Sequence, residues 1–199
     1  MPGRVTTPTE GEWSHVKTAD TYYGKIEARV HRRIARELRS ARRILDVGCG
    51  DCRLARLLAG DGRDRRVTGI DVSGAEFPRA GEARGSPRCV RADARALGFL
   101  ETGGFDAAVS LYSLHELGGP MACLREVGRL LCPGGEVLVV DFPKGSLAQR
   151  LWNEGYYTTA EVAGMLRRAG FVRVAARRTA RRQLTWARAF RPGPGRRYR

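Results

Sequence analysis

Apolar residues recur at helical spacing in four segments of the chain. Between Tyr22 and Leu38 they alternate with charged residues in a pattern that predicts an amphipathic helix. Residues 54–59, 121–131 and 158–169 show the same spacing, and Thr158 and Glu161 are placed as a capping box at the start of the last segment. The turn Cys132-Pro133-Gly134-Gly135 is expected to end the third helix, because proline lacks the helical donor.

Seven short apolar runs, each ended by polar or turn residues, predict β-strands. They cover residues 44–47, 67–72, 88–92, 105–111, 137–142, 171–176 and 183–190. The first five alternate with helical or loop segments, which favours a parallel sheet with right-handed crossovers. The last two are separated by about six residues, too few for a crossover helix, so they are expected to form an antiparallel hairpin at one end of the sheet. The sequence therefore predicts an α/β three-layer sandwich.

The segments at the two ends of the chain lack the apolar periodicity of elements that pack into a core. Residues 1–20 contain proline and glycine without a sustained period, so a flexible lead is expected before the amphipathic helix. The tail RPGPGRRYR, residues 191–199, is basic and is expected to be disordered. One domain, residues 41–190, lies between the lead-plus-helix of residues 1–40 and this tail.

Composition is that of a soluble globular protein, with 42% hydrophobic and 29% charged residues. No apolar run approaches the roughly 18 to 20 residues that span a bilayer, and the N-terminus has no signal-peptide pattern. We therefore expect a cytoplasmic protein, in which the five cysteines are reduced thiols.

The net charge of +15 is concentrated near the C-terminus. From Thr159 to Arg199 there are twelve arginines and one acidic residue, so the rest of the chain carries only +4. Such a cluster favours an anionic partner such as nucleic acid, but a bias toward arginine codons explains it as well.

Candidate chemistry lies where the predicted strands end, which is where open α/β sheets bind ligands. Asp46-Val47-Gly48-Cys49-Gly50 follows the first strand, and its glycines allow close backbone approach to a ligand. Cys49-x-x-Cys52 in the same loop is also a metal or redox spacing, but no further ligands or thioredoxin-like context accompany it. Carboxylates follow the second and third strands at Asp71 and Asp93, and SLYSLHE ends the fourth.

Five blocks together carry a resemblance to a known family: LDVGCGD, TGIDVS, RADARAL, FDAAVSLYSLHEL and LREVGRLLCPGGEVLVVDF. In order and spacing they resemble the class I S-adenosylmethionine-dependent methyltransferases, in particular the small-molecule type related to ubiquinone and menaquinone methyltransferases. The resemblance covers roughly residues 22–190 and implies a Rossmann-like fold. The family often has a third glycine where this chain has Cys52.

The resemblance also implies which residues hold the cofactor, S-adenosyl-L-methionine. Asp46, Gly48, Cys49 and Gly50 would lie against its methionine part. Asp71 would bind the ribose and Val72 the adenine face, Asp93 and Ala94 would bind the adenine edge, and Ser110 and Leu111 would lie near the sulfonium. Residues 1–40 would form part of a lid, completed by residues 143–157 with the aromatics Trp152, Tyr156 and Tyr157.

The expected reaction is methyl transfer to a small molecule by in-line displacement, for which the protein mainly positions the acceptor. His115 is the candidate general base and Tyr112 a candidate orienting hydroxyl, although each can equally be a packing residue. No metal site is expected, because Glu116 is not followed by a histidine at helical spacing. Two alternatives stay open: an RNA-directed methyltransferase that uses the arginine-rich part, and a non-catalytic module that binds the cofactor.

Overall fold

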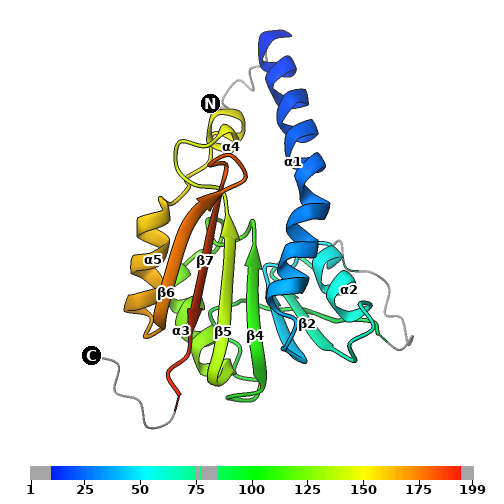
Figure 1. Ribbon diagram of the computed structural model, residues 1–199, viewed down its shortest axis with the longest axis vertical. Helices are drawn as coiled ribbons and strands as arrows, with labels where there is room; N and C mark the ends of the chain where they lie inside the picture. Colours follow the sequence, from blue (N-terminus) through cyan, green and yellow to red (C-terminus); the bar gives the residue numbers. More distant parts are fainter. Residues whose placement is uncertain (1–9, 75–76, 78–84, 194–199) are drawn as a thin grey trace, which may run out of the picture.

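The computed structural model describes residues 10–74, 77 and 85–193, with side chains from Tyr22 onward. Its centre is a seven-stranded sheet in the order β3-β2-β1-β4-β5-β7-β6 (Figure 1). The parallel strands are β1 (Arg43–Val47), β2 (Arg66–Asp71), β3 (Arg88–Arg91), β4 (Phe105–Leu111) and β5 (Leu131–Asp141). The hairpin strands β6 (Val172–Thr179) and β7 (Leu184–Phe190) complete the sheet, with β7 antiparallel to β5. The expected α/β fold with a C-terminal hairpin is confirmed.

Helices cover both faces of the sheet and make it the middle of three layers. α1 (Glu10–Glu37) and α2 (Arg53–Ala59) pack on one face, and α3 (Pro120–Leu130) and α5 (Thr159–Arg168) on the other. Successive strand residues point to opposite faces, so Val109 of β4 packs with the α1 side and Ala108 with the α3 side. Buried on both faces, the central strands therefore read as continuous apolar runs.

The starts of two elements and one additional helix differ most from expectation. α1 begins at Glu10 rather than Tyr22, so the lead is helical at least from residue 10, whereas residues 1–9 lie outside the described part. An additional short helix, α4 (Leu147–Trp152), occupies the segment expected to be a loop. β5 begins at Leu131 because Phe105 pairs with Leu131 and Ala107 with Glu136, so the Pro-Gly-Gly turn becomes an irregularity inside the strand. The tail expected to be disordered is described only to residue 193.

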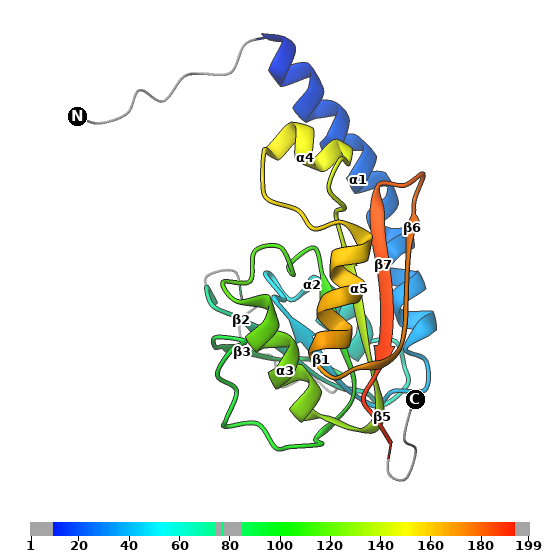
Figure 2. The ribbon, with the colours of Figure 1, turned by 90° about the vertical axis from the view of Figure 1, so that its left-hand side faces the viewer.

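α1 runs past the carboxyl ends of the parallel strands, and α4 lies beside this projecting part (Figures 1 and 2). The periodicity in the sequence marks the portion of α1 that packs on the sheet, because only that portion needs an apolar stripe. Its C-terminal end is held by the buried Arg65, whose guanidinium donates to the carbonyls of Ala35, Leu38 and Ala41 at 3.3, 2.7 and 3.2 Å. This anchor holds the C-terminal end of α1 at the amino ends of β1 and β2, the edge of the sheet opposite the candidate site.

Within the described residues, no helix combines the length and the apolar character needed to cross a membrane.

Candidate active site

Two adjoining cavities open at the carboxyl ends of β1, β2 and β4. The first, about 350 Å³, lies between the loop after β1 and α1, and the second, about 250 Å³, lies against the segment that follows β3. Both are lined by Gly48, Asp71, Ser113 and Glu116. The pair therefore forms one two-part cleft, and these four residues stand at the junction.

Gly48, in the loop after β1, lies against Ser113 in the turn after β4. Its φ is +69°, and a Cβ at this position would lie 2.5 Å from Cβ and 2.7 Å from Oγ of Ser113. The N–H groups of Gly48 and Cys49 both donate to the Ile70 carbonyl, at 2.9 and 3.0 Å. Glycine is thus required here for its backbone conformation and for the space above it.

Asp71, at the end of β2, connects two loops through its carboxylate. Oδ2 accepts from the Gly50 N–H at 3.0 Å, and Oδ1 accepts from the Ser73 N–H at 2.9 Å. The carboxylate is held in place by backbone donors and keeps acceptor capacity toward the cleft that it lines.

Two buried polar atoms of the described side chains have no hydrogen-bond partner, and their residues both line the first cavity: Asp46 Oδ2 and the Tyr112 hydroxyl. Burial raises the pKa of Asp46 to about 7, with only partial compensation by a backbone contact at Ala55. Tyr112 has a left-handed φ of 56°, and its ring stacks on Phe142 at 4.5 Å. Unsatisfied buried groups cost stability, so their place in a cavity points to a polar ligand.

The second cavity contains the residues expected at the adenine. Val72, Asp93 and Ala94 line it, and Val72 is 64% exposed in the absence of a ligand. The Asp93 carboxylate is bound by the Arg95 guanidinium through contacts of 2.6 to 3.0 Å, and this pairing lowers the pKa of Asp93 to about 2. Asp93 therefore stays ionised and would share its lone pairs between Arg95 and a ligand.

Ser110 and Leu111 differ in how they reach the site. Leu111 lines the first cavity, but Ser110 is buried behind it and lines neither cavity. The Ser110 hydroxyl is 2.8 Å from that of Ser113, which donates to the Val47 carbonyl at 2.8 Å. Ser110 thus supports Ser113, a lining residue that the sequence did not single out.

His115 lies in the turn after β4 and lines neither cavity. Its Nδ1 is 2.8 Å from Asp141 Oδ1 and its Nε2 is 3.0 Å from Glu154 Oε2. Burial lowers the pKa of His115, but the hydrogen bond and charge of Asp141 outweigh burial and raise the pKa above its usual value. The neighbouring Glu116, which the sequence also left out of the site, lines both cavities.

α1 supplies two lining residues that the sequence did not indicate, Glu27 and His31. Glu27 accepts at 2.9 Å from Arg53, which also lines the first cavity, and burial lowers the pKa of His31. The available signal was their spacing of four residues, beside the apolar stripe of the helix. Trp152 and Tyr156, expected in a substrate pocket, instead pack against Phe142.

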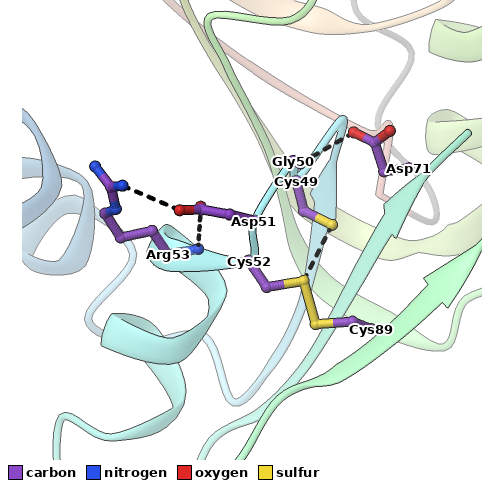
Figure 3. Close-up of a disulfide and its surroundings, with 7 residues drawn as sticks. All are labelled: Cys49, Gly50, Asp51, Cys52, Arg53, Asp71 and Cys89. Atoms are coloured by element: carbon purple, nitrogen blue, oxygen red, sulfur yellow. Dashed lines mark hydrogen bonds and ion pairs between the residues drawn. A yellow bond between two sulfur atoms is a disulfide. The ribbon is translucent and has the colours of Figure 1, made fainter. Parts of the chain in front are cut away.

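The cysteines correct a prediction. Cys52 forms a disulfide with Cys89 of β3, so the expectation that all five cysteines are reduced thiols is wrong for this pair, whereas Cys49, Cys123 and Cys132 are free (Figure 3). Cys49 Sγ also lies 3.4 Å from Cys52 Sγ, so the side chains of the Cys-x-x-Cys spacing do converge.

The reason for this convergence is a glycine on the neighbouring strand. A Cβ on Gly69 of β2 would lie 2.8 Å from Cys49 Sγ and 3.3 Å from Cys52 Sγ, so its absence makes room for the sulfurs. Burial and the charges of Asp46 and Asp71 raise the pKa of Cys49 to about 12, so its thiol stays protonated. Cys52 caps α2 with a left-handed φ of 58°, a conformation that suits the glycine the family often has there.

The cleft fits S-adenosylmethionine on two observations of this structure. The unpartnered Asp46 carboxylate suits a cationic amino group, and Asp71 lies where the two cavities join. These match the ammonium and ribose parts of a molecule with two unequal halves.

Comparison with known proteins agrees with this fit. A family model described as a methyltransferase domain matches residues 45–139. An uncharacterized methyltransferase of Mycobacterium tuberculosis is 38% identical over 112 residues, which are 55% of each chain. A demethylmenaquinone methyltransferase of Thermus thermophilus is 35% identical over 53% of this chain and 49% of its own. The chain thus spans about half the length of the curated relatives it matches.

A solved structure extends the likeness of fold to nearly the whole chain. The 1,6-didemethyltoxoflavin-N1-methyltransferase of Burkholderia thailandensis, with bound 1,6-didemethyltoxoflavin and S-adenosylhomocysteine, superposes with a TM-score of 0.63 at 22% identity. The superposition covers 96% of this chain and 94% of the other. The chain is thus similar in sequence, over about half of its length, to a methyltransferase domain and to named methyltransferases, and it is similar in fold to a solved S-adenosylmethionine-dependent methyltransferase.

Proposed function

We propose that the chain catalyses methyl transfer from S-adenosylmethionine to a small-molecule acceptor. The observation that carries this proposal is the two-part cleft, in which Asp71 joins a cavity containing the unpartnered Asp46 to a second cavity lined by Asp93 and Ala94. The names of relatives support it, since they include methyltransferases of demethylmenaquinone and of ubiquinone biosynthesis.

The residues of the chain would mainly bind and orient. The cofactor supplies a methyl group already activated by its sulfonium. Asp46 would hold the cationic amino group, Gly48 and Gly50 would admit the methionine chain, and Asp71 would accept from the ribose. α1, through Glu27 and His31, forms a wall of the first cavity and would limit the access of water, as proposed for residues 1–40 as part of a lid.

Tyr112 is the better supported of the two candidate catalytic residues. Its hydroxyl is unpartnered, it lines the first cavity, and burial raises its pKa, so it stays protonated and would donate a hydrogen bond to the acceptor. His115 as general base stays a prediction, and an apparent obstacle is that both its ring nitrogens already face carboxylates. A protonated acceptor such as a phenol or enol would need such a base, whereas an amine free at neutral pH would not.

Calorimetry with S-adenosylhomocysteine tests the cofactor site. Asp71→Ala should weaken binding at least roughly tenfold, because it removes the ribose acceptor and also the contact to Gly50. Asp64→Ala is the matched control, since Asp64 is an exposed loop residue outside both cavities. Equal affinity in the two variants would contradict the assignment.

Transfer of a labelled methyl group separates the function from its alternatives. The protein should label a member of a panel of small phenols, quinols and heterocyclic amines. Salt-sensitive labelling of total RNA instead would favour the RNA-directed alternative, for which the arginine-rich C-terminal part is the motive. Tight cofactor binding without transfer to any acceptor would favour the non-catalytic module. The cytoplasmic location also stays a prediction from the sequence.

A further inference from the structure

The His115 ring is clamped on one side by a buried carboxylate. Asp141, the last residue of β5, accepts from the backbone N–H groups of His115 at 3.0 Å and Phe142 at 2.7 Å, and its Oδ1 is 2.8 Å from His115 Nδ1. The two side chains are only 4% and 3% exposed. Because a carboxylate accepts, Nδ1 carries a hydrogen, and Nε2 is the nitrogen free to bind something else.

Nε2 faces two further carboxylates. Glu154 Oε2 lies 3.0 Å away and Glu116 Oε1 lies 3.8 Å away. In a neutral ring with its hydrogen on Nδ1, Nε2 presents a lone pair, and a lone pair turned toward two anions is repulsive. The arrangement therefore calls for a cation between these three groups, which is either a proton or a metal ion.

We propose that His115, Glu116 and Glu154 bind a divalent transition-metal ion at the rim of the cofactor cleft. Their ligand atoms all lie within 4.8 Å of one another. Neighbouring ligands at about 2.1 Å from an ion are roughly 3.0 to 3.4 Å apart, so Glu154 already has the required separation from Nε2. The Glu116 side chain is 66% exposed and is free to rotate the short distance that remains.

The chemistry of the donors selects the class of ion. One imidazole and two carboxylates suit Zn²⁺, Mn²⁺, Fe²⁺ or Co²⁺, whereas Mg²⁺ and Ca²⁺ prefer sites made of oxygen alone. Asp141 occupies the place of the outer carboxylate that commonly orients a metal-bound histidine and increases its basicity. The buried, oriented histidine distinguishes this cluster from an ordinary group of exposed acidic residues.

The location connects the ion with the cleft. Glu116 lines both cavities, so an oxygen atom of an acceptor held in the cleft can complete the coordination of the ion. This role in the reaction rests on the proposed function, although metal binding itself does not. A ligated His115 has no free nitrogen and is then a metal ligand rather than a general base.

Manganese titration of the full chain, followed by the electron paramagnetic resonance of free Mn²⁺, tests the proposal, with Zn²⁺ calorimetry as a second measurement. One ion should bind per chain, and Glu154→Gln should weaken binding at least roughly tenfold because it removes a charged ligand. Glu154 is about half exposed, so this variant is expected to fold. Glu101→Gln, an exposed acid outside the cluster, is the control and should bind as the parent does.

Two results would overturn the proposal: no stoichiometric binding up to millimolar metal, or equal affinity in Glu154→Gln and the parent. In either case the cation at Nε2 is a proton only. Asp141→Asn adds a graded readout, with a loss roughly tenfold or larger if Asp141 orients the ligating ring. Calorimetry with S-adenosylhomocysteine in the presence of a chelator reports the cofactor site independently, so failure of the metal site and of the proposed function are distinguishable.

Discussion

Two regions of this molecule treat their buried polar groups in opposite ways. Around α5 and the C-terminal hairpin, polar side chains find partners close by: the Thr159 and Thr185 hydroxyls are 2.8 Å apart, and Arg188 is paired with the buried Glu136. At the carboxyl ends of β1 and β4, Asp46 and Tyr112 are buried with unpartnered atoms. The second arrangement costs stability that the first does not.

The difference between paired and unpaired buried polar groups indicates which part of the fold binds a ligand. An unpartnered carboxylate and a glycine that no other residue can replace are expensive for a protein that only has to fold. Both lie in the cleft that we assign to the cofactor, whereas the polar pairs of α5 and the hairpin line neither cavity. Substitutions in the two regions should therefore separate stability from binding.

The largest effect is expected at Gly48. Gly48→Ala combines a left-handed φ with a Cβ only 2.5 Å from that of Ser113, so we expect affinity for S-adenosylhomocysteine to fall roughly a hundredfold or more. Gly62→Ala is the matched control, because φ is also positive, at +77°, no atom lies within 4 Å of the added Cβ, and Gly62 lines neither cavity. It should cost only about 1 to 2 kcal/mol of stability in thermal or urea unfolding and leave affinity unchanged. Equal losses of affinity in the two variants would show that backbone strain, rather than close approach at Gly48, causes the loss.

Substitution of Asp46 should raise the stability of the protein but weaken its binding of the cofactor. Its pKa is about 7 in the folded protein against 3.8 when unperturbed, so the fold disfavours the charged form. The resulting penalty is absent below pH 3.8, grows as the pH rises, and is complete above about pH 7. Asp46→Asn should therefore raise the free energy of unfolding by roughly 2 to 4 kcal/mol at pH 8, and progressively less toward pH 4. It should also weaken cofactor binding at least roughly tenfold.

Asp106, at the opposite end of the sheet, provides the contrast. Burial raises the pKa of Asp106, but hydrogen bonds from Arg43 outweigh burial and lower the pKa below its usual value. Asp106→Asn should therefore destabilise the protein at pH 8, with a difference that disappears as the pH falls through the lowered pKa. Urea unfolding at several pH values measures both variants. Destabilisation of Asp46→Asn at pH 8 would refute the idea that the buried carboxylate is kept for a ligand.

The sequence predicts the residues of this cleft that lie at the ends of strands. Asp46, Gly48 and Asp71 follow directly from the rule that parallel strands present their carboxyl ends at one edge, and all three line the first cavity. Ser113 and Glu27 were missed because their position depends on how a turn and a helix pack against that edge. No local pattern records such packing.

The surroundings of the cysteines and of His115 were missed for the same reason. The disulfide joins residues 37 positions apart in the sequence, and the convergence of Cys49 on Cys52 depends on a glycine in another strand. The sequence predicts His115 as a general base because nothing near it in the sequence reveals its two carboxylate partners. These are Asp141 on β5 and Glu154 after α4. Contacts between distant segments are the part of the site that needs the structure.

The smallest effect is expected in the region of α5 and the C-terminal hairpin, at the start of α5. Thr158 accepts from the Glu161 N–H at 3.1 Å and donates its own N–H to the Glu161 carboxylate at 2.6 Å, which completes the predicted capping box. Thr158→Ala should cost about 1 kcal/mol and lower the melting temperature by roughly 2 to 4 °C. Thr158→Ser keeps the hydroxyl and should change little.

Affinity for S-adenosylhomocysteine should be the same in all three proteins, because α5 packs on the sheet face away from α1 and lines neither cavity. A loss of affinity in Thr158→Ala would mean that the two regions are coupled, and the separation of stability from binding would not hold.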